Sequence, residues 1–139
     1  MGEHIDVLVI GAGQGGLSAS YFLTQQGVPH LVLERGEVGN AWRTDRWDSF
    51  TLVTPNWTIR LPGAEYQGNS PDAFMGREEF VAYLERWAKS FKCPLSANTE
   101  VTGLSSDGSA IRVETSEGAL TTANAIIATV ERGCLITFI

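Results

Sequence analysis

The feature that most constrains this chain is an apolar run, Val7 to Ile10, that passes directly into glycines. The run is aliphatic without polar alternation, which is typical of a strand buried on both faces of a parallel sheet. Gly11, Gly13 and Gly16 follow with the G-x-G-x-x-G spacing. In a nucleotide-binding turn the first glycine permits a tight turn, the second lets a pyrophosphate approach the backbone, and the third lets the next helix pack closely.

The spacing alone would also fit an ordinary glycine-rich turn, so the neighbouring segments must show whether the turn belongs to a nucleotide-binding unit. A helix is predicted from Gln14 to Gln26, because Gly27 and Pro29 supply the usual helix-stop residues. A second apolar run, His30 to Leu33, ends at Glu34, which lies 23 positions after the first glycine. A dinucleotide-binding fold places the carboxylate that binds the ribose hydroxyls at about this distance. The order of strand, turn, helix, strand and acid therefore predicts a dinucleotide-binding unit.

The phosphates of the cofactor are expected to face the turn and the start of the helix. The chain carries a formal net charge of −6 and no cluster of basic residues, which argues against a nucleic-acid surface. A polyanionic cofactor remains compatible with this charge, because free backbone N–H groups at a helix N-terminus bind phosphate without basic side chains. The cofactor-binding residues predicted in this turn are Gly11, Ala12, Gly13, Gln14, Gly15 and Gly16.

Length and composition predict one folded domain, residues 1–139, in a chain that is 43% hydrophobic. The first strand begins almost at once, without a secretory signal, and no run is long enough to cross a bilayer, so a cytoplasmic protein is expected. Cys93 and Cys134 lack a C-x-x-C partner, and a disulfide between them is the less favoured alternative. His4 and His30 have no helical or cysteine partner, so no metal site is predicted.

The residues after the predicted acid carry a more specific pattern. The pair Glu34-Arg35, followed by Gly39-x-x-Trp42-Arg43, resembles the N-terminal FAD-binding region of the flavin-dependent monooxygenases of the microsomal, plant auxin-forming and bacterial types. The resemblance implies that the acid holds the adenosine ribose and that Trp42 lies near the flavin. Trp42 could also serve as a packing aromatic that walls off the cofactor. The cofactor-binding residues expected in this segment are Glu34, Arg35, Ala41 and Trp42.

The stretch 46–57 is similar to the family segment that passes beside the isoalloxazine ring. Thr54 and Asn56 are the polar candidates for contacts with that ring, and Thr54 is retained as a predicted site residue. Three apolar residues of the stretch are interpreted as core residues instead: Phe50, Leu52 and Trp57.

The rest of the chain predicts the remaining elements of an α/β fold. A helix is expected from Arg77 to Phe91, with Phe80, Leu84, Trp87, Ala88 and Phe91 on one buried face. Asn98 to Leu104 is predicted to be a third parallel strand, Ser105 to Ala123 an antiparallel meander, and Ala125 to Thr129 a buried strand beside the first one. The predicted fold class is a Rossmann-like parallel sheet with crossover helices and a small antiparallel β-meander.

The resemblance extends to residues near the C-terminus and then breaks. It implies that the backbone at Val101 grips the adenine and that Thr129 touches the cofactor. The family usually continues Ala-Thr with glycine, whereas Val130 follows Thr129 here, and no second glycine fingerprint for NADPH occurs in the 139 residues. The resemblance implies that the strand and helix that complete the flavin site of the family lie outside these 139 residues. FAD is therefore the expected cofactor, with NADPH only where a partner or a missing domain supplies its site.

The sequence thus predicts the FAD-binding domain of a flavin-dependent monooxygenase-like oxidoreductase that is not competent alone for NADPH-driven turnover. One alternative is a stand-alone, non-catalytic flavin-binding or oligomerising module, and a weaker one is an NAD(P)-binding Rossmann domain with Arg35 facing a 2′-phosphate. No catalytic residue can be named. The apolar tail Cys134 to Ile139 predicts pairing within the sheet or with another copy. The expected partners are a second copy of the chain or a complementary reductant domain.

Overall fold

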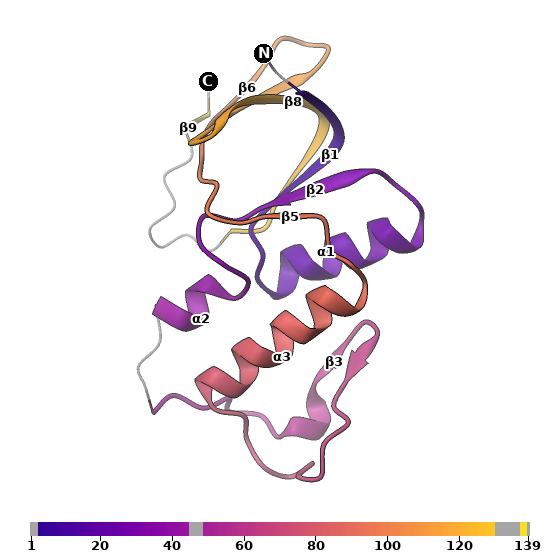
Figure 1. Cartoon of the computed structure of the whole chain (residues 1–139), viewed down its shortest axis with the longest axis vertical. Coiled ribbons are helices and arrows are strands. Elements are labelled where there is room, and N and C mark those ends of the chain that lie inside the picture. Colours follow the sequence, from indigo (N-terminus) through magenta and orange to yellow (C-terminus); the bar gives the residue numbers. More distant parts are fainter. Residues whose placement is uncertain (1–2, 45–48, 130–136, 139) are drawn as a thin grey trace.

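The structure is a computed structural model that describes residues 3–44, 49–129 and 137–138. In chain order its elements are β1 (Glu3–Ile10), α1 (Gln14–Gln25), β2 (His30–Leu33), α2 (Asn40–Thr44), η1 (Asn56–Thr58), β3 (Arg60–Leu61), β4 (Ala64–Glu65), α3 (Arg77–Ser90), β5 (Leu95–Ser96), β6 (Val101–Ser106), β7 (Ile111–Thr115), β8 (Gly118–Ile127) and β9 (Thr137–Phe138). The sheet lies toward one end of the molecule, and α3 and the β3–β4 hairpin lie side by side toward the other end (Figure 1).

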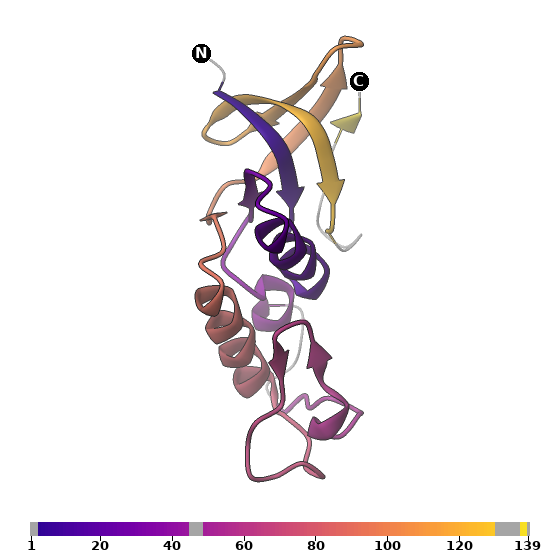
Figure 2. The same ribbon diagram turned by 90° about the vertical axis from the view of Figure 1, so that its right-hand side faces the viewer.

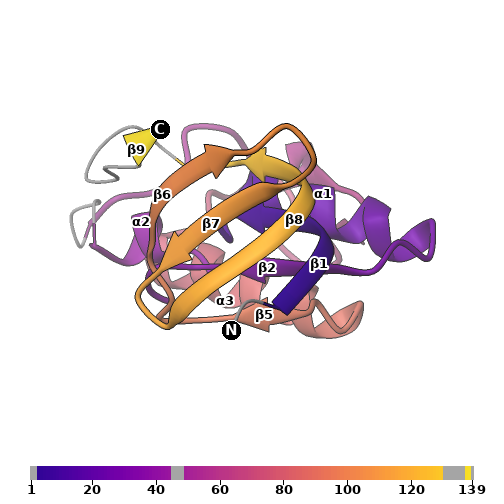
Figure 3. The ribbon, with the colours of Figure 1, turned by 90° about the horizontal axis from the view of Figure 1, so that it is seen from above.

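Seven strands form one mixed sheet in the order β5-β2-β1-β8-β7-β6-β9. The first four of these strands pair in parallel, and β7 pairs antiparallel with both β8 and β6. Seen from above, β6 and β7 curl over the plane of β1 and β2 (Figure 3). The sheet therefore combines the predicted Rossmann-like parallel part with the predicted antiparallel meander.

The second half of β1, Val7–Ile10, is buried on both faces, which explains its uninterrupted aliphatic sequence. Val9 packs with Val32 and Leu17 in a core shared with α1 and α3. Its neighbours Leu8 and Ile10 point the other way and pack in a second core with residues of the curled meander. Successive side chains of a strand alternate between faces, so both sets need apolar residues when both faces are covered.

The predicted strand–helix–strand unit is confirmed. Helix α1 begins after Gly13 and ends at Gln25, and Gly27 then takes a φ of +69°, a left-handed conformation that glycine adopts without strain. Strand β2 pairs in parallel with β1 from His30 opposite Val7 to Leu33 opposite Ile10. The turn, the helix and the acid at the end of β2 are thereby brought to the same edge of the sheet.

Helix α3 also follows its predicted pattern, with Phe80, Leu84, Trp87 and Ala88 buried. The Trp87 indole Nε1–H donates a hydrogen bond to the Pro62 carbonyl oxygen at 2.9 Å. This bond links the helix to the β3–β4 hairpin, which lies against α3 and away from the main sheet (Figure 2). Ile59 and Met75 of the segment 49–76 are buried in the same core as Val9 and Phe80, so this segment packs on the core that α3 shares with α1.

Three predictions about the elements are wrong. The third parallel strand is β5, two residues that pair with β2, whereas β6 joins the antiparallel meander. Residues 120–122 and 125–127 belong to one strand, β8, whose Ile126 and Ile127 are exposed rather than buried. The side chain of Trp57 is largely exposed and is not a core residue, whereas Leu52 packs partly buried against the core.

The end of the chain is described only at Thr137 and Phe138, which pair in parallel with Gly103 and Leu104 of β6. The predicted pairing of the tail within the sheet is confirmed for these two residues, and self-association stays a prediction. Cys134 and the stretch 45–48 lie outside the described residues. Among the helices that the structure describes, none combines the length and apolarity needed to cross a bilayer.

Candidate functional site

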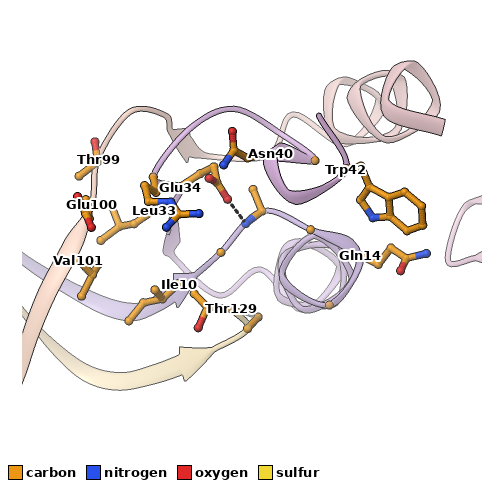
Figure 4. A pocket seen from close by; sticks show the side chains of 17 residues that line it. Ile10, Gln14, Leu33, Glu34, Asn40, Trp42, Thr99, Glu100, Val101 and Thr129 are labelled. Atoms are coloured by element: carbon orange, nitrogen blue, oxygen red, sulfur yellow. Dashed lines mark hydrogen bonds between the residues drawn. The ribbon is translucent and has the colours of Figure 1, made fainter. Parts of the chain in front are cut away.

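A cavity of about 260 Å³ lies at the edge of the sheet where β1, β2 and β8 end. Ligands of open α/β sheets bind outside the carboxyl ends of the strands, at the place where neighbouring strands connect in opposite directions. The chain leaves β1 toward β2 on one side, while β8 returns on the other side. The residues that line the cavity are Ile10, Gly11, Ala12, Gly13, Gln14, Gly15, Leu33, Glu34, Arg35, Gly39, Asn40, Trp42, Thr99, Glu100, Val101, Ala128 and Thr129 (Figure 4).

The three glycines of the fingerprint meet different physical demands. Gly11 has a φ of +109°, and a Cβ added there would lie 2.7 Å from the Ala128 carbonyl oxygen. A Cβ at Gly16 would collide with the Gly11 carbonyl, so this position requires glycine for close packing of α1 on the turn. Gly13 has open space around its Cβ position. The backbone at Gly13 is therefore accessible from the cavity, which is what close approach of a pyrophosphate requires.

The N-terminus of α1 opens on this cavity. Gly13 is the N-cap residue and provides no side-chain hydrogen bond, and the first turn has no acidic residue. The N-cap residue thus leaves the amides of the first turn without a side-chain cap, and the helix dipole favours negative charge there. Phosphate groups are the ligands that such a helix start binds.

Glu34 directly follows β2, and its carboxylate is directed at the glycine turn (Figure 4). The Ala12 N–H donates to Oε1 at 3.0 Å, and the Gly36 N–H donates to Oε2 at 2.6 Å. The residue is only 8% exposed, and these bonds fix the orientation of the carboxylate. Each carboxylate oxygen can accept further hydrogen bonds, so the group remains able to bind sugar hydroxyls at the cavity.

Trp42 lies toward one end of the cavity, near Gln14, whereas Glu34, Glu100 and Val101 lie toward the other end (Figure 4). The indole is packed against Phe80, with the ring centroids 4.6 Å apart, and against Phe50 at 5.4 Å. Trp42 therefore packs against two aromatic rings and also lines the cavity. An elongated ligand can extend from the carboxylate end to the indole end.

The structure brings most of the predicted site residues together. Arg35, Val101 and Thr129 line the cavity with the glycine turn, Glu34 and Trp42, and Ala41 lies in α2 next to Trp42. Thr54 is exposed and does not line this cavity. The contact of Thr54 with the flavin ring stays a prediction. Asn56 is buried, and its Nδ2 donates to the Ser70 carbonyl oxygen at 2.9 Å.

Several residues that line the cavity were not predicted as site residues, notably Thr99 and Glu100. They follow β5, a strand of two residues that carries no periodic signal. The Thr99 N–H donates to the Glu34 carbonyl oxygen at 2.8 Å, and the Glu34 N–H donates to the Ser96 carbonyl oxygen at 3.0 Å. Ligands bind beyond the carboxyl ends of parallel strands, so an assignment of β5 as a parallel strand would have predicted that the loop after it lines the site.

A polar cluster outside the cavity joins α1 to β2 and to the residues after α3. Ser20 Oγ lies 2.7 Å from His30 Nε2 and 3.4 Å from Cys93 Sγ, and His30 Nδ1 lies 2.9 Å from the Val28 carbonyl oxygen. Burial raises the pKa of the Cys93 thiol, although the hydrogen bond with Ser20 lowers it in part. Cys93 is a free thiol in this structure. These contacts account for His30 as a hydrogen-bonded structural residue.

The comparisons with known proteins agree with this geometry. A family model described as pyridine nucleotide-disulphide oxidoreductase matches residues 8–131. The chain belongs to this family. The CzcO-like uncharacterized oxidoreductase of Geobacillus kaustophilus is 36% identical to it over 129 residues, which are 91% of this chain and 36% of the relative. A Baeyer-Villiger monooxygenase of Streptomyces coelicolor is 35% identical over 128 residues, 86% of this chain and 24% of the relative.

A solved structure shows the same fold. A flavin-containing monooxygenase from Stenotrophomonas maltophilia superimposes with a TM-score of 0.79 at 33% identity, over 91% of this chain and 38% of that chain. The resemblance to the N-terminal region of the flavin monooxygenases and the predicted fold class are both confirmed. The chain spans well under half the length of these relatives.

Proposed function

We propose that this chain binds FAD and forms the FAD-binding part of a flavin monooxygenase-type oxidoreductase. The observation that carries the proposal is the Glu34 carboxylate, buried, fixed by two backbone N–H groups and placed in the same cavity as the open backbone of Gly13. A ribose and a pyrophosphate are the two neighbouring groups that such a pair of features fits.

The residues present fit both ends of this cofactor. Glu34 would accept hydrogen bonds from the ribose hydroxyls, and the amides at the start of α1 would face the pyrophosphate. The backbone at Val101 lies at the same end as Glu34 and would hold the adenine, while Trp42 at the opposite end would wall the flavin side (Figure 4). Bound FAD supplies the redox chemistry, and the residues of this chain bind it, orient it and exclude water from it.

Turnover with NADPH needs a nicotinamide site in addition. The chain has one glycine fingerprint, at Gly11, Gly13 and Gly16. We propose that the reductant site belongs to a partner or to a further domain, so that the chain alone binds FAD without catalysing NADPH oxidation. The substrate of the complete oxidoreductase would be selected by residues outside this cavity.

The test is FAD binding by the purified chain and by Glu34→Gln, with Glu117→Gln in the exposed β7–β8 turn as the matched control. We expect a yellow 1:1 complex of the unaltered chain and of the control. Glu34→Gln should weaken FAD binding about tenfold or more, because charge-assisted hydrogen bonds to the ribose are lost. A thermal melt of each apo chain separates lost binding from lost folding.

Three outcomes would contradict the proposal. A folded chain that does not bind FAD would contradict the proposal that the chain is an FAD-binding domain. Tight binding of NADP⁺ in place of FAD would favour the NAD(P)-binding alternative. NADPH oxidation by the chain alone would show that the reductant site lies within these 139 residues.

A further inference from the structure

Helix α2 forms the wall that carries Trp42, yet it has only five residues. A helix of this length is not stable by itself in water, so its position depends on contacts with the rest of the molecule. On the side of the glycine turn, the Gly39 N–H donates to the Ala12 carbonyl oxygen at 3.0 Å, directly before α2 begins. On the other side, α2 packs against α3 (Figure 2).

Arg43 links α2 to α3 through polar contacts. Its guanidinium Nη2 donates to the Glu85 carboxylate on α3, and its Nε donates to the Val38 carbonyl oxygen at 3.1 Å. Glu37 adds a looser ion pair at 3.6 Å. The side chain is 31% exposed, so most of it is shielded from solvent. Arg43 therefore ties the residues before α2, α2 itself and the middle of α3 together.

A second contact from α3 reaches the same residue. Arg77, at the start of α3, donates through Nη1 to the Arg43 carbonyl oxygen at 3.4 Å. Phe80, one turn further along, packs against the Trp42 ring. The residue next to Trp42 is thus held through both its side chain and its backbone by the helix that also packs on the indole. Neither Arg43 nor Glu85 lines the cavity.

We propose that Arg43 and Glu85 form a clamp that sets the position of Trp42 and so pre-organises the flavin end of the site. The inference rests on the proposed FAD function and adds two positioning residues that act through Trp42 from outside the cavity. Pre-organisation strengthens binding because the free protein already holds the bound arrangement. Loss of the clamp leaves the fold in place and loosens α2.

The test compares Glu85→Gln with Glu79→Gln, a matched change of an exposed acid on another face of α3. We expect Glu85→Gln to weaken FAD binding about threefold to tenfold. The effect is modest because the Arg43–Glu85 ion pair is partly exposed and acts on the site only through the position of Trp42. The visible circular dichroism of the bound flavin should change as well, while the melting temperature stays close to that of the control. Glu79→Gln should leave the affinity and the flavin spectrum unchanged.

A double-mutant cycle with Trp42→Phe tests whether the clamp acts through the indole. If it does, Glu85→Gln has a smaller effect on FAD affinity in the Trp42→Phe chain than in the unaltered chain. Equal effects in the two backgrounds, or unchanged affinity in Glu85→Gln, would overturn the inference.

Amide hydrogen exchange in the apo chain keeps this test separate from the FAD proposal. The peptide that covers residues 39–44 should exchange faster in Glu85→Gln than in Glu79→Gln, because α2 opens more often. Faster exchange in a chain that never binds FAD would contradict the proposed function and retain the link between Glu85 and α2. Unchanged exchange in a chain that does bind FAD would contradict the clamp alone.

Discussion

Residues 3–34 and residues 49–76 differ in how their sequence relates to their structure. In the first region strand, glycine turn, helix and strand appear as the sequence predicts, and the site lies at their edge. The second region contains Val53, Trp57 and Phe74, which are large, apolar and exposed, at 89%, 53% and 49%. The comparison shows that glycines at positions where the backbone requires them predict local structure better than the hydrophobicity of single residues does.

The largest expected effect tests the backbone requirement of the first region. Gly11→Ala should lower the free energy of unfolding by about 3 kcal/mol, because alanine is strained at a φ of +109° and its Cβ would approach the Ala128 carbonyl. Urea denaturation of the apo chain measures this change.

Gly13→Ala is the matched control for that prediction. Its φ of −90° suits alanine and its Cβ position is open, so stability should change by less than about 0.5 kcal/mol. FAD binding should nevertheless fall, because the added methyl group occupies the approach of the pyrophosphate. Equal destabilisation by the two substitutions would mean that the turn does not have the described conformation.

A second prediction separates buried from exposed tryptophan at the boundary of the second region. Trp87→Phe should cost about 2 kcal/mol, because it leaves a small void and removes the hydrogen bond to the Pro62 carbonyl. The corresponding change Trp57→Phe should cost less than about 0.5 kcal/mol, because that indole is largely exposed. Urea denaturation of the two variants measures both losses of stability. A larger loss for Trp57→Phe than for Trp87→Phe would contradict the exposed position of Trp57.

The smallest effect concerns Tyr83, which faces the β3–β4 hairpin. Its hydroxyl is buried and has no hydrogen-bond partner among the described residues, and burial raises its pKa above 10.0. Tyr83→Phe should therefore leave the free energy of unfolding unchanged or raise it by up to about 1 kcal/mol at pH 7. A clear loss of stability would show that the hydroxyl has a partner.

The pH dependence of the same substitution gives a signed check. Because the pKa of Tyr83 is higher in the folded chain than in the unfolded chain, its contribution to stability is fully present below about pH 10 and is lost as the pH rises further. The Tyr83→Phe chain has no phenol to ionise and so lacks this loss. Its stability relative to the unaltered chain should therefore increase in denaturation measurements as the pH rises above about 10.

The elements that sequence reasoning found are those with strong local signals. Helix α3 has an apolar face at helical spacing, and the first strand–helix–strand unit is marked by Gly11, Gly27 and Glu34. The misassigned strands lack such signals. Strand β5, Leu95–Ser96, is too short to show any periodicity, and β6 resembles a parallel strand until its partner β7 is known.

By itself the sequence determined that Val7–Ile10 is buried on both faces, that a glycine turn follows it, and that Glu34 comes directly after the next strand. These features depend on steric limits at single residues and on chain order, which act locally. Only the tertiary structure decided which strand pairs beside β2, that Thr99 and Glu100 join the cavity, that Thr54 does not line it, and that Arg43 meets Glu85. Such contacts join residues far apart in the chain, and their geometry is set by how the packed layers fit together.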